Sequence, residues 1–156
     1  MKCPIKVNSS MLGVELDIQS SEFGYSIELV TTIEGKPVFN PALHVTDDYS
    51  GARMNLYADH AHYAVEGLQA IVTGFGTSRI DLMDPDGSLI FTRYYEKPHT
   101  VYVDIEFDLC CFADAHCFSS DAVGIKTDMT FEDYKRFVHD FASVVDNFDA
   151  PVDYKH

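Results

Sequence analysis

The sequence predicts an α+β fold, in which a mostly antiparallel sheet carries two helices packed on one face. Several short segments alternate apolar and polar residues, which is typical of half-buried strands, and two longer segments repeat apolar residues every three or four positions, as helices do. The order strands, helix, strands, helix shows no strict repeat, which favours antiparallel pairing over a repeated βαβ unit.

The chain has the length of one ordinary domain. It contains 156 residues, of which 46% are hydrophobic and 13% aromatic, and a chain of this size buries roughly two thirds of the surface that its unfolded form exposes. No Pro-rich or Ser-rich linker interrupts the sequence. We therefore expect residues 1–156 to form a single domain.

Strands are expected in the N-terminal part. Residues 14–18 and 25–29 each alternate apolar with polar or acidic side chains, and residues 34–37 supply turn residues between strands. The segment 38–45 predicts an edge or irregular strand, because Pro41 has no N–H to donate to a ladder. A further short extended piece is expected at residues 53–57.

The first helix is predicted over residues 59–76, where apolar residues from Ala61 to Phe75 recur at helical spacing. Asp59 is the expected N-cap, and Gly74 or Gly76 is the expected stop. Gly67 lies inside this helix at a cost of about 1 kcal/mol relative to Ala, which indicates a close approach to the sheet.

A hairpin and two further strands are predicted next. Residues 78–96 indicate two strands joined by the turn Asp84-Pro85-Asp86-Gly87, residues 99–109 a long strand, and residues 121–128 an extended return. The chain then closes with a helix over residues 130–148, whose apolar stripe includes Phe137 and Phe141. Thr130 is its predicted N-cap, with Asp133 in a variant of the capping box.

The chain is strongly acidic. It has 25 Asp and Glu against 11 Lys and Arg, a formal net charge of -14 and a pI near 4.6. Such a charge repels nucleic acid and anionic lipid, so neither is an expected partner. No apolar run has the length of a signal peptide or of a membrane span. We therefore expect a cytoplasmic protein with reduced cysteines.

Acidic residues occupy the polar parity of the predicted strands. Three of them, Asp104, Glu106 and Asp108, alternate with apolar residues along one strand. If the apolar parity packs under the helices, the acidic residues share the opposite face with Arg79; they are Glu15, Asp17, Glu28, Asp81, Asp104, Glu106 and Asp108. Like charges on neighbouring strands destabilise a sheet, so this face predicts a binding surface for a basic protein partner.

Three tyrosines, Tyr94, Tyr95 and Tyr102, are expected partly on the same face as anchors for that partner. Two alternatives remain open. In one, the acidic residues are ordinary solvated positions of a structural or adaptor domain whose acidity serves solubility. In the other, the chain is a small metal-dependent or acid–base enzyme.

Two clusters carry the enzyme alternative. The first predicted helix holds His60 and, four apart on one face, His62 and Glu66. A later segment holds Cys110, Cys111, His116 and Cys117. Their residue types suit zinc, but adjacent cysteines point to opposite faces of a strand and the chain has no Cys-x-x-Cys pair. The sequence also has no Gly-x-Ser-x-Gly elbow and no Gly-rich loop between a strand and a helix. We therefore expect no catalytic residue, no metal and no cofactor.

The order of elements carries a resemblance. The hairpin "IDLMDPDGSLIFTRYYE", the strand "HTVYVDIEFDL" and the closing helix "MTFEDYKRFVHDFASVVD" resemble the arrangement in small cytoplasmic immunity proteins of bacterial polymorphic and contact-dependent toxin systems, particularly the WapI-type group. This resemblance implies a protein without catalytic residues that binds and blocks a cognate toxin domain, often a basic nuclease. The acidic strand face is the surface expected to do so.

Overall fold

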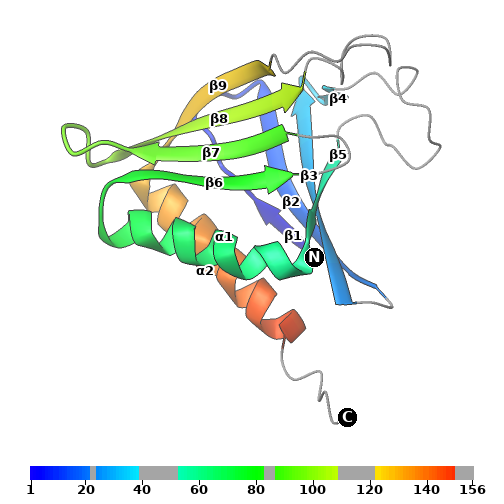
Figure 1. Ribbon diagram of the computed structural model, residues 1–156. Coiled ribbons are helices and arrows are strands. Elements are labelled where there is room, and N and C mark those ends of the chain that lie inside the picture. Colours follow the sequence, from blue (N-terminus) through cyan, green and yellow to red (C-terminus); the bar gives the residue numbers. More distant parts are fainter. Residues whose placement is uncertain (22–23, 39–52, 83–86, 109–121, 150–156) are drawn as a thin grey trace.

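A computed structural model describes residues 1–21, 24–38, 53–82, 87–108 and 122–149 (Figure 1). Within these ranges the chain forms two antiparallel sheets and two helices, which confirms the predicted α+β class. The predicted strands do not form one sheet, however. They divide between two sheets at the first helix, because the strands before it pair with one another and so do those after it.

The first sheet is built from the N-terminal strands. β2 and β3 form a long hairpin at its centre, β1 pairs with β2, and both β4 and β5 pair with β3. Its strands are β1 (Lys2–Pro4), β2 (Leu12–Ser21), β3 (Gly24–Ile33), β4 (Lys36–Pro37) and β5 (Arg53–Tyr57).

The second sheet is a four-stranded meander in the order of the sequence. It comprises β6 (Gly76–Leu82), β7 (Gly87–Arg93), β8 (Thr100–Asp108) and β9 (Ala122–Thr130). The predicted hairpin is confirmed by the pairing of β6 with β7, and its turn residues Asp84, Pro85 and Asp86 lie outside the described residues. The segment 39–45 and Cys110 to Cys117 also lie outside them.

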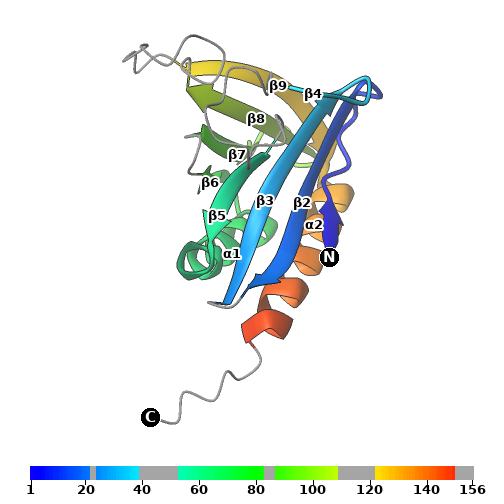
Figure 2. The ribbon, with the colours of Figure 1, turned by 90° about the vertical axis from the view of Figure 1, so that its right-hand side faces the viewer.

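Two helices, α1 (Ala58–Thr73) and α2 (Phe131–Asp149), pack on the inner face of the β6–β9 sheet and against each other. Figures 1 and 2 show both helices beneath this sheet, with the first sheet standing at an angle beside them. α1 also contacts β3 and β5, and α2 contacts β1, so the core is shared by both sheets and both helices.

The closing helix α2 follows the prediction closely. Thr130 caps it, since the backbone N–H of Asp133 donates to Thr130 Oγ1 at 3.1 Å. Phe137 and Phe141 of its apolar stripe are buried, and their rings stack 5.8 Å apart. The hydroxyl of Tyr134 donates to the backbone oxygen of Leu68 at 2.7 Å, which ties α2 to α1.

The first helix differs from its prediction at its start and ends where predicted. It begins at Ala58, so Asp59 is not the N-cap, and it ends at Thr73, directly before the predicted stop Gly74. Phe75 follows the helix and is 46% exposed instead of joining the core. Gly67 does mark a close approach: a Cβ there would lie 2.6 Å from Ser78 Oγ on β6.

Arg93, at the end of β7, holds the region where three elements meet. Its guanidinium donates to the oxygens of Gly74 at 3.0 Å and Pro98 at 2.8 Å. The same group lies over the rings of Phe131, at 3.6 Å, and Phe75, at 4.6 Å. One cation thereby caps the carboxyl end of α1 and fixes the β7–β8 connection against the start of α2.

Among the described residues, neither helix combines the length and apolar character needed to cross a membrane.

Candidate functional site

The seven predicted acidic residues do not share one sheet face. Three of them, Glu15, Asp17 and Glu28, belong to β2 and β3 of the first sheet. The others, Asp81, Asp104, Glu106 and Asp108, belong to β6 and β8 of the second sheet. Parity gave the correct outward direction on each strand, but the strands themselves belong to separate sheets.

On the first sheet the carboxylates are engaged within the chain. Glu15 pairs with Lys2 at 3.8 Å, and Asp17 lies 3.7 Å from the N-terminal amine. Asp17 is only 8% exposed, so it has little surface to offer a partner. Glu28 stands opposite Asp17 in the ladder and also has an interaction of its own. This group is better described as internal contacts of the sheet.

The second sheet presents a continuous polar surface, which we call the outer face: the side of β6–β9 that points away from the helices. The strand register arranges its side chains in rows that cross all four strands. One row runs Arg79, Ile90, Asp104, Lys126, and the next runs Asp81, Ser88, Glu106, Gly124. The two rows are adjacent, because their members on each strand are two residues apart. Charged side chains of one row are therefore close to those of the next.

One corner of the outer face is a closed hydrogen-bond cluster. Arg79 donates from Nε to Asp81 Oδ1 at 2.8 Å and from a terminal nitrogen to Ser88 Oγ at 2.8 Å, and Ser88 donates to the same carboxylate oxygen at 2.9 Å. The carboxylate of Asp81 is thus neutralised, although its side chain is 65% exposed. This corner is held rigidly by contacts within the chain.

The centre of the outer face is different. Asp104 and Glu106 are half-buried, yet among the described residues neither carboxylate forms an ion pair. Lys126 stands directly opposite Asp104 in the β8–β9 ladder without coming within 4.0 Å of it. Asp108 ends β8, and its side chain lies outside the described part of the chain. Counting only residues that the structure describes, the centre therefore holds two carboxylates without an ion pair beside the unpaired ammonium group of Lys126.

Sequence reasoning missed Lys126 as a member of this surface. The alternation of Gly124, Lys126 and Asp128 placed all three on one parity, which was the available signal. The register was required to show that Lys126 faces Asp104 and that Gly124 faces Glu106.

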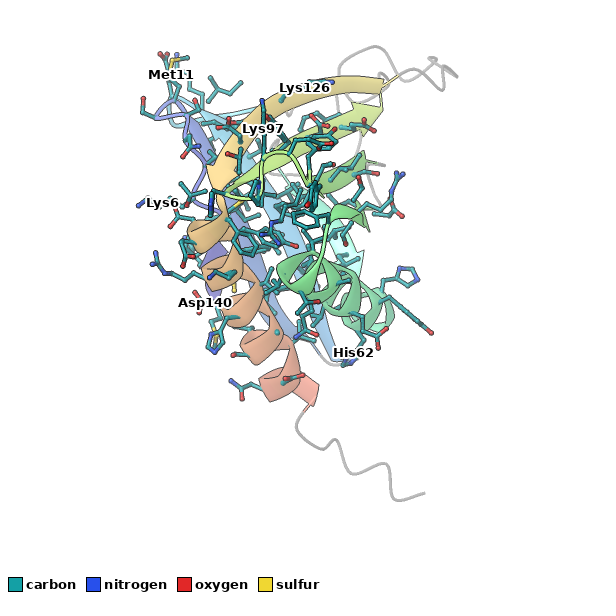
Figure 3. The ribbon with its side chains drawn as sticks, turned by 90° about the vertical axis from the view of Figure 1, so that its left-hand side faces the viewer. Lys6, Met11, His62, Lys97, Lys126 and Asp140 are labelled. Atoms are coloured by element: carbon teal, nitrogen blue, oxygen red, sulfur yellow. The ribbon has the colours of Figure 1, made fainter. Side chains whose placement is uncertain are left out.

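Aromatic residues lie at the end of the second sheet where β7 connects to β8, and the strand register places Tyr102 on the outer face. Tyr94 and Tyr95 are 52% and 76% exposed, and the rings of Tyr94 and Tyr102 meet edge to face at 5.6 Å. Lys97 donates to the Tyr102 hydroxyl at 3.0 Å, and this hydrogen bond raises the pKa of the Lys97 ammonium group. Figure 3 shows Lys97 at the β7–β8 connection.

One of the two α1 histidines lies beside the corner of the outer face that Arg79 and Asp81 form. His60 lines a pocket of about 310 Å³ between α1 and β6, which also contains Tyr63, Arg79 and Asp81. His62 and Glu66 are exposed on α1. In the part of the chain that the structure describes, no three His, Cys, Asp or Glu residues are grouped to hold a metal ion.

Cys3 is the one cysteine in the described residues, and it is a free, buried thiol. Burial raises the pKa of this thiol to about 11. Because the thiolate is the reactive form, Cys3 is a poor nucleophile at neutral pH and packs as a small apolar side chain.

A comparison with protein-family models and a search of curated proteins found no match to this chain.

Proposed function

We propose that this chain is an inhibitory binding protein, which blocks a basic protein partner by covering it with the outer face of the β6–β9 sheet. The observation that carries the proposal is the pair Asp104 and Glu106, half-buried on that face without an ion pair among the described residues. Partly desolvated carboxylates gain most from a cation brought by a partner when no cation within the described ranges pairs with them.

Three further features support this function. The net charge of -14 steers a basic partner toward the protein. The exposed rings of Tyr94 and Tyr95 supply the aromatic anchors that charged surfaces lack. The order of the last four strands and α2 also resembles immunity proteins of bacterial toxin systems, which makes a toxin domain with a basic active site the proposed partner.

The experiment compares two variants that remove the same charge from different sheets. Asp104→Asn with Glu106→Gln neutralises the centre of the outer face, and Glu15→Gln with Glu28→Gln neutralises the first sheet. Each variant captures partners from the source lysate at low and high salt, and the captured protein is then used to measure association rates. We expect the first variant alone to lose a basic partner at low salt.

Equal losses in both variants would reduce the effect to overall charge and contradict a specific surface. Retention of the partner by the outer-face variant would also contradict the proposal. The captured protein must be the product of the gene beside that of this chain if the pair is a toxin and its inhibitor.

A second function, a small acid–base enzyme, is favoured by one observation: the pocket between α1 and β6 brings His60 close to Asp81 and Arg79. Its volume of about 310 Å³ falls at the lower end of ligand pockets. A fragment library screened by melting temperature tests it. Fragments that stabilise the protein but not its His60→Gln variant would support the enzyme, and a library without hits would contradict it.

A further inference from the structure

β9 is one of the two edge strands of the second sheet, and β6 is the other. Near its carboxyl end the outer edge of β9 is covered by the N-terminal arm: the N–H of Asn8 donates to the backbone oxygen of Asp128 at 2.8 Å, and the Asn8 side chain donates to the Asp128 carboxylate at 2.8 Å. The peptide groups of Asp128 therefore point away from β8. In an antiparallel ladder this direction alternates, so those of Lys126 and Gly124 also point outward.

Among the described residues, no backbone group pairs with the outward peptide groups of Gly124 and Lys126. An uncovered edge of this kind is a template for another strand. On the side of the sheet that faces the helices, apolar side chains lie beside this edge. They line part of a groove of about 160 Å³ and include Met11, Ile33 and Ile125. Met11 is 56% exposed and Ile33 is 42% exposed. Figure 3 shows Met11 and Lys126 at the same end of the molecule.

On the outer side, Gly124 leaves an opening toward Glu106. A Cβ placed on Gly124 would lie 3.9 Å from Glu106 Cγ, so no side chain of β9 separates this carboxylate from the edge. A residue of an added strand opposite Gly124 stands two strand spacings from Glu106, about 10 Å. A lysine at that position and Glu106 can together bridge this distance, so that the ammonium group meets the carboxylate.

A second copy of the chain supplies that lysine. When two β9 strands pair antiparallel about Ile125, each Gly124 faces the Lys126 of the other copy, and the two Ile125 residues face each other. Gly124 and Lys126 both have outward peptide groups, so they form the hydrogen-bonded pairs, and Ile125 takes the non-hydrogen-bonded pair, as the ladder requires. One two-fold arrangement therefore gives a regular hydrogen-bond ladder, brings Lys126 near Glu106 of the other copy, and places the two Ile125 side chains in contact.

We propose that the protein forms a symmetric dimer by pairing the outer edges of two β9 strands about Ile125, with Lys126 of each copy bound to Glu106 of the other. This joins two four-stranded sheets into one continuous sheet. The Asn8–Asp128 contact sets its limit, since the arm occupies the edge beyond Thr127. The inference goes beyond the proposed function. In the dimer Glu106 is paired with Lys126 of the second copy, and Asp104 is the carboxylate that remains for a basic partner.

The test measures the oligomeric state by sedimentation equilibrium over a range of protein concentrations. Wild type is expected to form dimers. Lys126→Glu places like charges across the interface and should weaken the dimer by at least about tenfold, and combining it with Glu106→Lys should restore it. Lys97→Glu makes the same charge change at the far end of the sheet and should leave the dimer unchanged.

A backbone variant tests the strand pairing itself. Lys126→Pro removes an N–H that points away from β8, so the ladder with β8 is kept while the added strand loses a donor. This variant should be a folded monomer with a melting temperature near that of the wild-type monomer, whereas Lys126→Ala should weaken the dimer less. In the wild type, the amide protons of Gly124 and Lys126 should exchange more slowly as dimer forms.

A wild type that is monomeric at every concentration would overturn the proposal, and so would a dimer that survives both Lys126→Glu and Lys126→Pro. Slowed exchange only after addition of a basic peptide would assign the edge to a different occupant and also overturn it. Asp104→Asn separates this inference from the proposed function, since it should weaken partner binding and leave the dimer intact.

Discussion

The two faces of strand β8 differ in what surrounds them. On the inner face Val101, Val103 and Ile105 are fully buried against the helices, whereas on the outer face Asp104 and Glu106 are half-buried and have no ion pair among the described residues. The two faces of β8 therefore have separate roles, one in stability and one in binding. Changes on the inner face alter stability, and changes on the outer face leave the fold intact while altering what the sheet can bind.

The sharpest test of this division uses two adjacent residues of β7. Phe91 points inward, is fully buried and packs its ring 5.4 Å from Tyr134 and 5.7 Å from Phe137. Phe91→Ala should lower the free energy of unfolding by about 3–5 kcal/mol, because it leaves a cavity between β7 and α2. Ile90 lies on the outer face, and Ile90→Ala should cost less than about 1 kcal/mol. Urea denaturation measures both, and similar losses would break the comparison.

The fixed space under the inner face gives the second prediction. Gly67→Ala places a methyl group against the buried Ser78 hydroxyl and should cost about 1–2 kcal/mol of stability. In a Ser78→Ala background the obstruction is gone, and the same change should stabilise α1 by up to about 1 kcal/mol through helix propensity. The measurement is a double-mutant cycle from urea denaturation. An unchanged sign in the second background would contradict the close approach.

The third prediction concerns the polar contact between the two helices. Burial raises the pKa of Tyr134 above its ordinary value of 10.0, because it disfavours the phenolate in the folded state. The unfolded chain ionises this group near pH 10 and the folded chain does not, so its contribution is fully present below pH 10 and is lost as the pH rises further. Tyr134→Phe should cost about 1 kcal/mol at pH 7.

The difference in stability between wild type and Tyr134→Phe should shrink above pH 10. Unfolding curves measured from pH 7 to about pH 11 test this, because the remaining tyrosines titrate equally in both proteins. A constant difference across that range would mean that the Tyr134 hydroxyl is not buried in the folded state.

The smallest effect is expected on the outer face. Asp104→Asn removes one of two neighbouring carboxylates that have no ion pair within the described part of the chain. The free energy of unfolding should change by no more than about 0.5 kcal/mol, or rise. Thermal denaturation at low salt measures it. A loss above about 1 kcal/mol would show that the outer face is part of the structural framework and would remove the distinction between the two faces.

The sequence predicted strand directions well because parity is local. The alternation from Val101 to Phe107 was sufficient to separate inward from outward residues, and the spacing from Tyr134 to Phe141 was sufficient to define the buried stripe of α2. The division into two sheets was not predictable in this way, since it depends on which strand edges pair across α1. For the same reason Glu15 and Asp104 were expected on one face.

Pairing also determined what the candidate site contains. Lys126 and Gly124 belong to the centre of the outer face only through the register of β9 with β8. Asp17 appeared exposed by parity, but the chain start folds over it and leaves it 8% exposed. The positions of Lys126 and Gly124 and the burial of Asp17 depend on contacts between residues far apart in sequence. The periodicity of apolar residues does not predict such contacts.

The bond between Asn8 and Asp128 joins residues separated by 120 positions. Closing so long a loop carries a large cost in chain entropy, so this contact gains its full value only after both sheets are assembled. The arm is therefore expected to dock late in folding and to open first, without unfolding the sheets behind it. Each opening lengthens the uncovered edge of β9 by one residue pair.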